Sequence, residues 1–481
     1  MFKDASEMTL AAQKKQVSPK ELVEHAITII ERENKRVNAV VSERFEKALD
    51  EASKAIFQGQ AFFGVPLLLK DLGQEMAGEP STCGSRLLEK TIMTETDHYV
   101  KSLERLGFII IGRTNTPEFG FKNISDSDLH GSVNLPADIS RNSGGSSGGA
   151  AAAVASGMVP LAAASDGGGS IRIPASFNGL IGLKPSRGRI PVGPRSFRGW
   201  QGASVQFALT KSVRDTTRLL YHLQTCQLES PFPLPTLSKL ALDDRSFKKL
   251  RIAVSYDSPI NSSVSSEAVV ALNQTISQLQ SLGHEVEVID KAIIDGREAM
   301  QTYYLVNSVE TALMFQQMEN SLGRQLRQDD MELMTWSIFK TGQSIDAVTY
   351  AQLLAKWDSY SYQMHCFHQH YDLLLTPTTA DVAPKHHQFD LSHSLKEALS
   401  EIEHYQRQEQ EELIWTMFEK SLSLTPFTQQ ANLTGQPAIS LPVYKTSAGL
   451  PLGVQLVAAK GREDILLAVA RQLEEIGAFI Q

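Results

Sequence analysis

Short apolar runs bounded by polar residues recur along the chain between amphipathic stretches. Such runs predict buried strands, whereas apolar residues spaced three and four apart predict helices. The strands predicted from such runs are 63–69, 108–111, 250–254, 371–375, 438–441 and 453–457, and an alternating pattern predicts a further strand at 284–288. The predicted helices begin after the Ser18-Pro19 pair, occupy about 100–106 and 265–282, and close the chain at 462–475.

Strands and helices alternate over the whole length, which indicates an α/β protein whose helices cover a mainly parallel or mixed central sheet. The length of 481 residues suits one large domain with insertions or two to three smaller ones, and we expect one large domain. We divide it into N-terminal helices at about 1–60, a core at about 61–230, and C-terminal strands and a helix at about 431–481. Residues 290–430, richer in Gln, Met, Trp and Tyr, are expected to form a helical cap or insertion.

Composition narrows the classes of function. The chain has 46 Lys and Arg against 54 Asp and Glu, a formal net charge of −8, so its overall charge does not favour nucleic acid. The most apolar stretch, 149–164, is mostly alanine and contains Gly157 and Pro160, which makes it a poor membrane span. The first residues lack the apolar core of a secretory signal, and three scattered cysteines give no disulfide framework. We therefore expect a soluble, cytoplasmic protein.

The segment 144–169 departs sharply from average composition, because eight of its 26 residues are glycine and eight are alanine. Average usage would give about two glycines. Because glycine is costly inside regular structure, this concentration indicates unusual backbone angles or a closely approached backbone. Three interpretations compete: a flexible linker, a phosphate-binding loop, and a nucleophile site whose N–H groups stabilise an oxyanion. The Ala/Val run argues against a linker, and the missing G-x-x-x-x-G-K-S/T and G-x-G-x-x-G patterns argue against a phosphate loop.

Two serines compete for the role of nucleophile. Ser146 satisfies the G-x-S-x-G pattern of a nucleophile elbow, but residues 136–143 before it indicate a polar turn instead of the required strand. Ser170 directly follows the glycines 167–169, and consecutive small residues allow their amides to converge on one oxyanion. With no histidine in these motifs, the candidate base is Lys70, after a predicted strand. A desolvated lysine can accept a proton, although by position alone Lys70 could equally lie at the surface.

The chain resembles the amidase signature family most closely at 144–189, GGSSGGAAAAVASGMVPLAAASDGGGSIRIPASFNGLIGLKPSRGR. GVPLLLKDL (64–72) and GRTNTPEFG (112–120) are similar to the family's upstream motifs, and GQPAISLPV (435–443) and GLPLGVQLVA (449–458) to its C-terminal strands. The resemblance spans about residues 5–478. It implies the family's α/β fold and an amidohydrolase, which acts on carbon–nitrogen bonds other than peptide bonds.

The resemblance also implies a Ser-Ser-Lys triad. Ser170 would be the nucleophile that forms the acyl-enzyme, Ser146 the bridging serine and Lys70 the base. A cis peptide bond would join Gly145 to Ser146. Neutral Lys70 would take a proton through Ser146 as Ser170 attacks the amide carbonyl, and water would then hydrolyse the acyl-enzyme.

Further residues receive roles from the same resemblance. Asp166 and Arg172 would brace the glycine loop, and the backbone at Gly120 would touch the substrate. The oxyanion would be held by the backbone N–H groups of four consecutive residues, Gly167, Gly168, Gly169 and Ser170.

Two positions depart from the family pattern. Gly167 stands where the family usually has threonine or a β-branched residue, and residues 208–211 replace a frequent Gly-Pro turn.

Other details, such as LLLKDL and TNTPEFG, resemble the branch that contains 6-aminohexanoate cyclic-dimer hydrolase, which implies a small linear or cyclic amide as substrate. An alternative is the A subunit of glutamyl-tRNA amidotransferase, a glutaminase within a complex, although its usual Asp-Gln pair is missing near 204–207. A non-catalytic relative is disfavoured because all three triad positions are filled.

The remaining candidates are interpreted as structural. A set of side chains spaced like metal ligands is better explained by a solvated helix end: His365, Cys366, His368 and His370. Cys83 is expected to be a small buried residue and not a second nucleophile. The tryptophans could line a pocket, with core packing as the default: Trp200, Trp336, Trp357 and Trp415. No metal and no cofactor are implied, the expected partner is a small-molecule amide, and a homodimer is left open.

Overall fold

The computed structural model describes residues 2–244, 249–290 and 292–480. The strands are β1 (Val40–Glu43), β2 (Pro66–Lys70), β3 (Ile109–Thr114), β4 (Asp126–Ser127), β5 (Gly131–Ser132), β6 (Asn134–Leu135), β7 (Asp138–Asn142), β8 (Ala162–Asp166), β9 (Ile181–Lys184), β10 (Val205–Thr210), β11 (Arg251–Val254), β12 (Glu285–Val288), β13 (Leu373–Pro377), β14 (Ala438–Lys445) and β15 (Pro451–Ala458). The α-helices are α1 (Ala5–Gln13), α2 (Pro19–Val37), α3 (Phe45–Lys54), α4 (His98–Arg105), α5 (Gly148–Ala155), α6 (Arg172–Asn178), α7 (Val213–Leu223), α8 (Lys239–Asp243), α9 (Ser266–Ser281), α10 (Gly296–Leu322), α11 (Leu333–Ser344), α12 (Ala347–Phe367), α13 (His393–Ser400), α14 (Arg407–Leu422), α15 (Gln429–Leu433) and α16 (Glu463–Glu475). The 3₁₀-helices are η1 (Arg86–Leu88), η2 (Glu118–Gly120), η3 (Gly199–Gly202), η4 (Gln328–Asp330) and η5 (Ile402–His404).

The main sheet, within the described residues, has eight strands in the order β12-β11-β13-β15-β14-β9-β10-β8. β11 is parallel to β12 and to β13, and the remaining neighbours are antiparallel. Parallel pairing needs a long crossover, which α9 provides between β11 and β12, whereas the short segment 446–450 joins β14 to β15 as a hairpin. The mixed sheet that the sequence predicted is confirmed, and its parallel part is confined to one edge.

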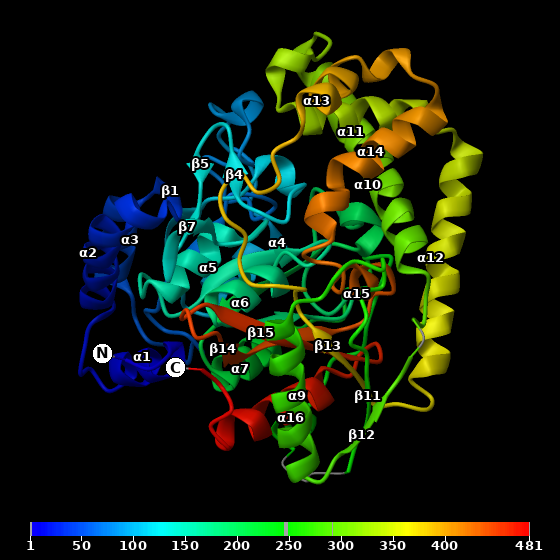
Figure 1. The fold of residues 1–481 in the computed structure, drawn as a ribbon. Helices are drawn as coiled ribbons and strands as arrows, with labels where there is room; N and C mark the ends of the chain where they lie inside the picture. The colour runs from blue at the N-terminus through cyan, green and yellow to red at the C-terminus, as the bar shows by residue number, and fades with distance from the viewer. Residues whose placement is uncertain (1, 245–248, 291, 481) are drawn as a thin grey trace.

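Strand residues alternate between the two faces of this sheet. In β13, Leu373 and Leu375 enter the main core together with residues of α9 and α16. Leu374, between them, packs on the opposite face with Ala253 of β11 and Ala431 of α15. Helices therefore cover both faces of the sheet, as Figure 1 shows, and the chain forms a single α/β domain.

A smaller sheet, in the order β1-β3-β2, places the end of β2 against β8 of the main sheet. Lys70 contacts Ser165, and Gln74 donates to the backbone oxygen of Ala164. Every residue of β2 and β8 is buried. A polar side chain at the end of either strand must therefore find its partner inside the protein.

The segment predicted to be a helical cap contains α10 to α14 (Figure 1). Four of these helices, α10, α11, α13 and α14, share an apolar cluster that includes Phe315, Phe339, Leu399 and Trp415, whereas α12 packs in a separate cluster through Trp357. The limits of the cap stay a prediction. None of the helices in the described part of the chain combines the length and apolar character that crossing a bilayer requires.

The strands and helices that the apolar pattern predicted are confirmed as β2, β3, β11 to β15, α2, α4, α9 and α16. Ser18 caps α2, as its place before Pro19 indicated, because its hydroxyl accepts the N–H of Glu21 and its own N–H reaches the Glu21 carboxylate at 2.7 Å.

We predict that Glu463→Gln lowers the free energy of unfolding by about 3–5 kcal/mol, because it leaves a buried guanidinium unpaired. Glu463, at the start of α16, contacts Arg189 at 3.0 and 3.1 Å, and both side chains are buried. Denaturant unfolding measures the change. Asp464→Asn, which breaks the more exposed pair with Arg462, should cost no more than about 1 kcal/mol. Equal losses in the two variants would contradict this account.

Candidate active site

The glycine-rich segment is ordered and largely buried, and most of its glycines lie where a Cβ would meet a neighbouring atom. It supplies α5, β8 and the loop before α6. At Gly149 a Cβ atom would lie 2.4 Å from the backbone nitrogen of Asn115, closer than atoms can approach.

Residues 138–142 form β7, where the sequence indicated a turn. This strand pairs with the two-residue β6 and is partly exposed, so it is not the buried strand that a nucleophile elbow requires.

Lys70 ends β2 with its side chain fully buried. Its Nζ lies 2.7 Å from Oγ of Ser146 and 3.0 Å from Oγ of Ser165. Burial lowers the pKa of Lys70 to about 7, although the negative charge of Asp166 acts in the opposite direction. A large share of Lys70 is therefore an uncharged amine at neutral pH, and the surface position that the sequence left open is excluded.

Ser146 and Ser170 belong to two segments that are tied together. Ser146 is buried and follows a cis peptide bond from Gly145, as the resemblance implied. The N–H of Ser147 donates to the backbone oxygen of Ser170 at 3.3 Å. Ser146 and Ser170 line the same cavity, in which Ser170 is partly exposed. The structure thus places the amine of Lys70 against Ser146, and Ser146 and Ser170 in the wall of one cavity.

The loop from Gly167 to Ser170 connects β8 to α6. The N–H of Gly169 donates to Oδ1 of Asp166 at 2.7 Å, so this group is not available to an oxyanion, contrary to what the resemblance implied. Gly169 has φ +131°, an angle that favours glycine. Within the described chain, the N–H groups of Gly167, Gly168 and Ser170 donate to no other protein atom. These three are the available donors of the loop.

Asp166 and Arg172 form a buried ion pair, and Asp166 also accepts the N–H of Gly169 in this loop. Nε and Nη2 of Arg172 each donate to a carboxylate oxygen of Asp166 at 2.9 Å. Burial opposes ionisation of Asp166, but the charge and hydrogen bonds of Arg172 outweigh it and hold the pKa of this carboxyl well below its usual range. Both groups therefore remain charged and fixed in a bidentate geometry.

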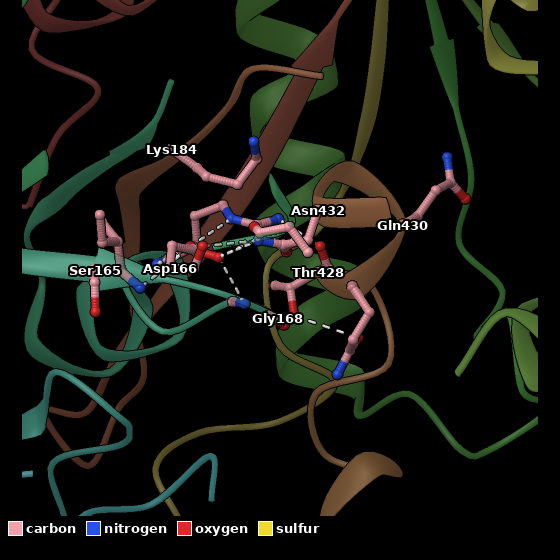
Figure 2. A network of polar contacts seen from close by, with 12 residues as sticks. Ser165, Asp166, Gly168, Lys184, Thr428, Gln430 and Asn432 are labelled. Carbon is pink, nitrogen blue, oxygen red and sulfur yellow. Dashed lines mark hydrogen bonds and ion pairs between the residues drawn. The ribbon is translucent and has the colours of Figure 1, made fainter. Parts of the chain in front are cut away.

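Residues far along the chain complete this network. Arg172 donates to the backbone oxygen of Thr428 at 2.8 Å and to the side-chain oxygens of Gln455 and Asn432 at 2.6 Å each. The hydroxyl of Thr428 donates to the backbone oxygen of Gly168 at 2.7 Å. Figure 2 shows Thr428 and Asn432 on the side of the loop opposite Ser165. Sequence reasoning gave no role to Thr428, Asn432 or Gln455. Gln455 lies in the C-terminal motif 449–458, whereas no motif marks Thr428 and Asn432.

A cavity of about 800 Å³ extends from the three serines Ser146, Ser165 and Ser170. Apolar side chains form much of its wall, among them Leu72, Leu87, Leu88, Phe119, Phe121, Trp200, Met314 and Met318. Gly120, with φ +74°, also lines it, and a Cβ there would lie 2.6 Å from Leu72 and 3.2 Å from Oγ of Ser146. The backbone can approach the site at this point only because the residue is glycine.

Of the other candidates from the sequence, Cys83 and Trp200 line the cavity, and the rest lie elsewhere. Cys83 lines the cavity, but burial, together with Glu75 and Asp71, raises the pKa of its thiol well above the ordinary value, so it stays protonated. Trp200 also lines the cavity, whereas the other tryptophans lie in apolar clusters. The histidines at 365–370 lie at and beyond the end of α12, and the described residues contain no group of three His, Cys, Asp or Glu side chains placed to hold a metal ion.

A second buried lysine provides a comparison for Lys70. Lys184 ends β9, and its Nζ donates to the backbone oxygen of Pro185 at 2.8 Å. Burial and the charge of Arg172 lower the pKa of Lys184 to about 7. Of the two lysines, only Lys70 contacts the hydroxyl of a serine in the cavity.

Comparison with known proteins identifies close relatives over nearly the whole chain. Lipoamidase of Enterococcus faecalis is 40% identical over 478 residues, which cover 98% of this chain and 63% of that protein. The chain therefore spans less than two thirds of that relative. The 6-aminohexanoate-cyclic-dimer hydrolase of Paenarthrobacter ureafaciens is 32% identical, with 98% of this chain and 94% of that protein covered.

Solved structures agree with these sequence matches. The structure of 6-aminohexanoate cyclic dimer hydrolase complexed with substrate superposes with a TM-score of 0.90 at 32% identity, covering 99% of this chain and 97% of that one. A bacterial aryl acylamidase of the amidase signature family has the same fold, with a TM-score of 0.85 at 24% identity. The family model described as Amidase matches residues 21–467. The chain belongs to the amidase family, and the two relatives named above are, by name, an amidase and a hydrolase.

Proposed function

We propose that this protein hydrolyses small linear or cyclic carboxylic amides through an acyl-enzyme formed on Ser170. The observation that carries the proposal is the 2.7 Å contact between the buried amine of Lys70 and the hydroxyl of Ser146, next to the loop that bears Ser170. In this proposal Lys70 is the base, Ser146 the relay and Ser170 the nucleophile.

The proposed reaction moves one proton along this chain of groups in each direction. Ser170 Oγ attacks the carbonyl carbon, its proton passes to Ser146, and Ser146 passes its own proton to neutral Lys70. As the C–N bond breaks, the proton returns through Ser146 to the leaving amine. Water then attacks the ester of Ser170 by the same relay and releases the carboxylic acid. Each step needs an uncharged Lys70 at its start or end, which burial provides.

The oxyanion of each tetrahedral intermediate would be held by the free N–H groups of Gly167, Gly168 and Ser170. They lie on a loop that is held by two hydrogen bonds, one from the Gly169 N–H to Asp166 and one from the Thr428 hydroxyl to the Gly168 carbonyl. Donors that are fixed before the reaction begins need no reorganisation as charge develops, which is how such sites lower a barrier.

The size and lining of the cavity support a substrate with an apolar portion. A volume of about 800 Å³ with many apolar side chains exceeds what a two-carbon amide would fill. The two relatives named above are a lipoamidase and a hydrolase of a cyclic dimer of 6-aminohexanoate. We extend to this chain the hydrolysis of an amide, and we take the linear hydrocarbon chain next to it from the second name and from the apolar lining of the cavity. A small-molecule partner, a cytoplasmic location and a homodimer stay predictions.

We predict that kcat/KM rises with pH to a plateau, with a midpoint near the pKa of about 7 of Lys70. Below the midpoint Lys70 is protonated and cannot accept a proton, so the rate should fall about tenfold per pH unit. Lys70→Met should lower kcat by about 10²–10⁴-fold and remove this pH dependence. A rate–pH profile on one soluble amide measures both effects.

The matched control is Lys184→Met, which removes another buried lysine whose pKa is about 7. Because Lys184 does not contact the serines, its variant should keep the midpoint. If Lys184→Met abolishes the acid limb while Lys70→Met retains it, the base has been assigned to the wrong lysine.

A fluorophosphonate probe should label the purified protein at Ser170, and Ser170→Ala should abolish the labelling. Turnover should fall by at least about 10⁴-fold in this variant. Mass spectrometry of the labelled peptide identifies the side chain, with Ser165→Ala as the control that keeps a label. Labelling that requires added partner subunits would instead favour the alternative, the A subunit of a glutamyl-tRNA amidotransferase.

A further inference from the structure

Gly167 is glycine because of a neighbouring ring and not because of its own backbone. Its φ lies outside the left-handed range, unlike that of Gly169. A Cβ at Gly167 would lie 2.5 Å from Cζ3 and 2.7 Å from Cε3 of Trp200. The indole therefore occupies the volume that a side chain at residue 167 would fill, next to a free N–H donor of the loop.

The backbone of Trp200 is held in an unusual conformation. Trp200 and Gln201 have φ of +49° and +51°, a region that bulky residues rarely adopt. Such angles persist only where surrounding contacts enforce them. Here the N–H of Ala203 donates to the Trp200 carbonyl at 2.9 Å, and the Gln201 side chain donates to Glu310 of α10 at 2.9 Å.

Two aromatic residues fix the plane of the indole. Phe121 stacks nearly parallel to Trp200, with an 11° angle and 6.1 Å between ring centres. Tyr303 meets Trp200 edge to face at the same separation. Trp200 and Phe121 both line the cavity that contains Ser146 and Ser170. One rigid ring face thus borders the cavity beside the glycine loop.

We propose that the pair Gly167 and Trp200 determines substrate specificity, selecting amides whose chain next to the scissile group is unbranched and apolar. A methylene chain lies flat on an indole, whereas a branch at the first carbon would meet the ring that already fills the space over Gly167. The inference rests on the proposed amidase function. The inference also accounts for glycine at residue 167, where the family usually has threonine or a β-branched residue, since such a side chain would leave no room for the ring of Trp200.

The test compares Trp200→Ala with Trp200→Phe and the wild type on two series of amides. One series keeps the amine and varies the acyl group through acetyl, hexanoyl and 2-methylhexanoyl. The other keeps the acyl group and varies the amine through methyl, hexyl and 1-methylhexyl. The series in which selectivity occurs identifies which side of the amide faces the ring.

We expect the wild type to favour the unbranched over the branched substrate by at least about tenfold in kcat/KM in one series. Trp200→Ala should reduce this ratio to about twofold while it still hydrolyses the shortest amide, and Trp200→Phe should keep most of it. Trp415→Phe, outside the cavity, should leave the ratio unchanged. A wild type without preference, or a ratio that survives in Trp200→Ala, overturns the inference. Loss of Ser170 labelling in the wild type would instead overturn the proposed function.

A double-mutant cycle tests the pairing itself. Gly167→Ala should lower kcat/KM by at least about tenfold because the new Cβ displaces the indole, and adding Trp200→Ala should recover part of that loss. Gly199→Ala is the matched control, since a Cβ at Gly199 comes no closer than 3.7 Å to a neighbour and should cost little. Strictly additive losses would contradict the pairing. The comparison of Trp200 variants holds even if Gly167→Ala fails to fold.

Discussion

The ion pair between Asp166 and Arg172 is the contact on which the geometry of the site depends. Both side chains are fully buried, so the charges can be kept only where every donor and acceptor has a partner. The guanidinium meets this demand with bonds to Asp166, Thr428, Asn432 and Gln455. Because Asp166 also accepts the N–H groups of Gly169 and Ile171, the same pair fixes the course of the glycine loop. A buried ion pair adds little net stability, but it specifies one arrangement.

Two buried lysines show that a lowered pKa alone does not make a catalytic base. Burial brings the pKa of both Lys70 and Lys184 to about 7. Within the described residues, the amine of Lys184 hydrogen-bonds only to a backbone carbonyl, which cannot give up a proton. Lys70 contacts the hydroxyls of Ser146 and Ser165, and both serines line the cavity. Access to a proton donor, and not basicity, separates a candidate base from a structural residue.

Much of the fold follows from local patterns, and the exceptions have physical causes. The apolar runs identified β2, β3, β11 and β13 to β15, because these strands are rich in Leu, Ile and Val, and an alternating pattern identified the mostly exposed β12. β8 has the sequence AAASD, which lacks the β-branched residues that mark strands, so it was not predicted, and β9 and β10 were missed with it.

Some residues of the candidate site could be predicted from the sequence, and others could not. The positions of Lys70, Ser146 and Ser170 could be expected from the family resemblance, whereas position alone left Lys70 ambiguous. Ser165 lies in a strand without a pattern, and Thr428 and Asn432 lie more than 250 residues from Arg172, so only the folded chain reveals their contacts. The engagement of the Gly169 N–H by Asp166 likewise depends on the exact course of the loop.

The residues that hold the glycine loop in place come from distant parts of the chain, and this affects the order in which the site forms during synthesis on the ribosome. Lys70, Ser146 and Ser170 precede residue 171, but the partners of Arg172 lie at 428, 432 and 455. Because long-range contacts form only after their last segment has emerged, a nascent chain carries its reactive groups for hundreds of residues without the scaffold that orients them. The proposed nucleophilic centre is therefore complete only after residue 455 has left the ribosome.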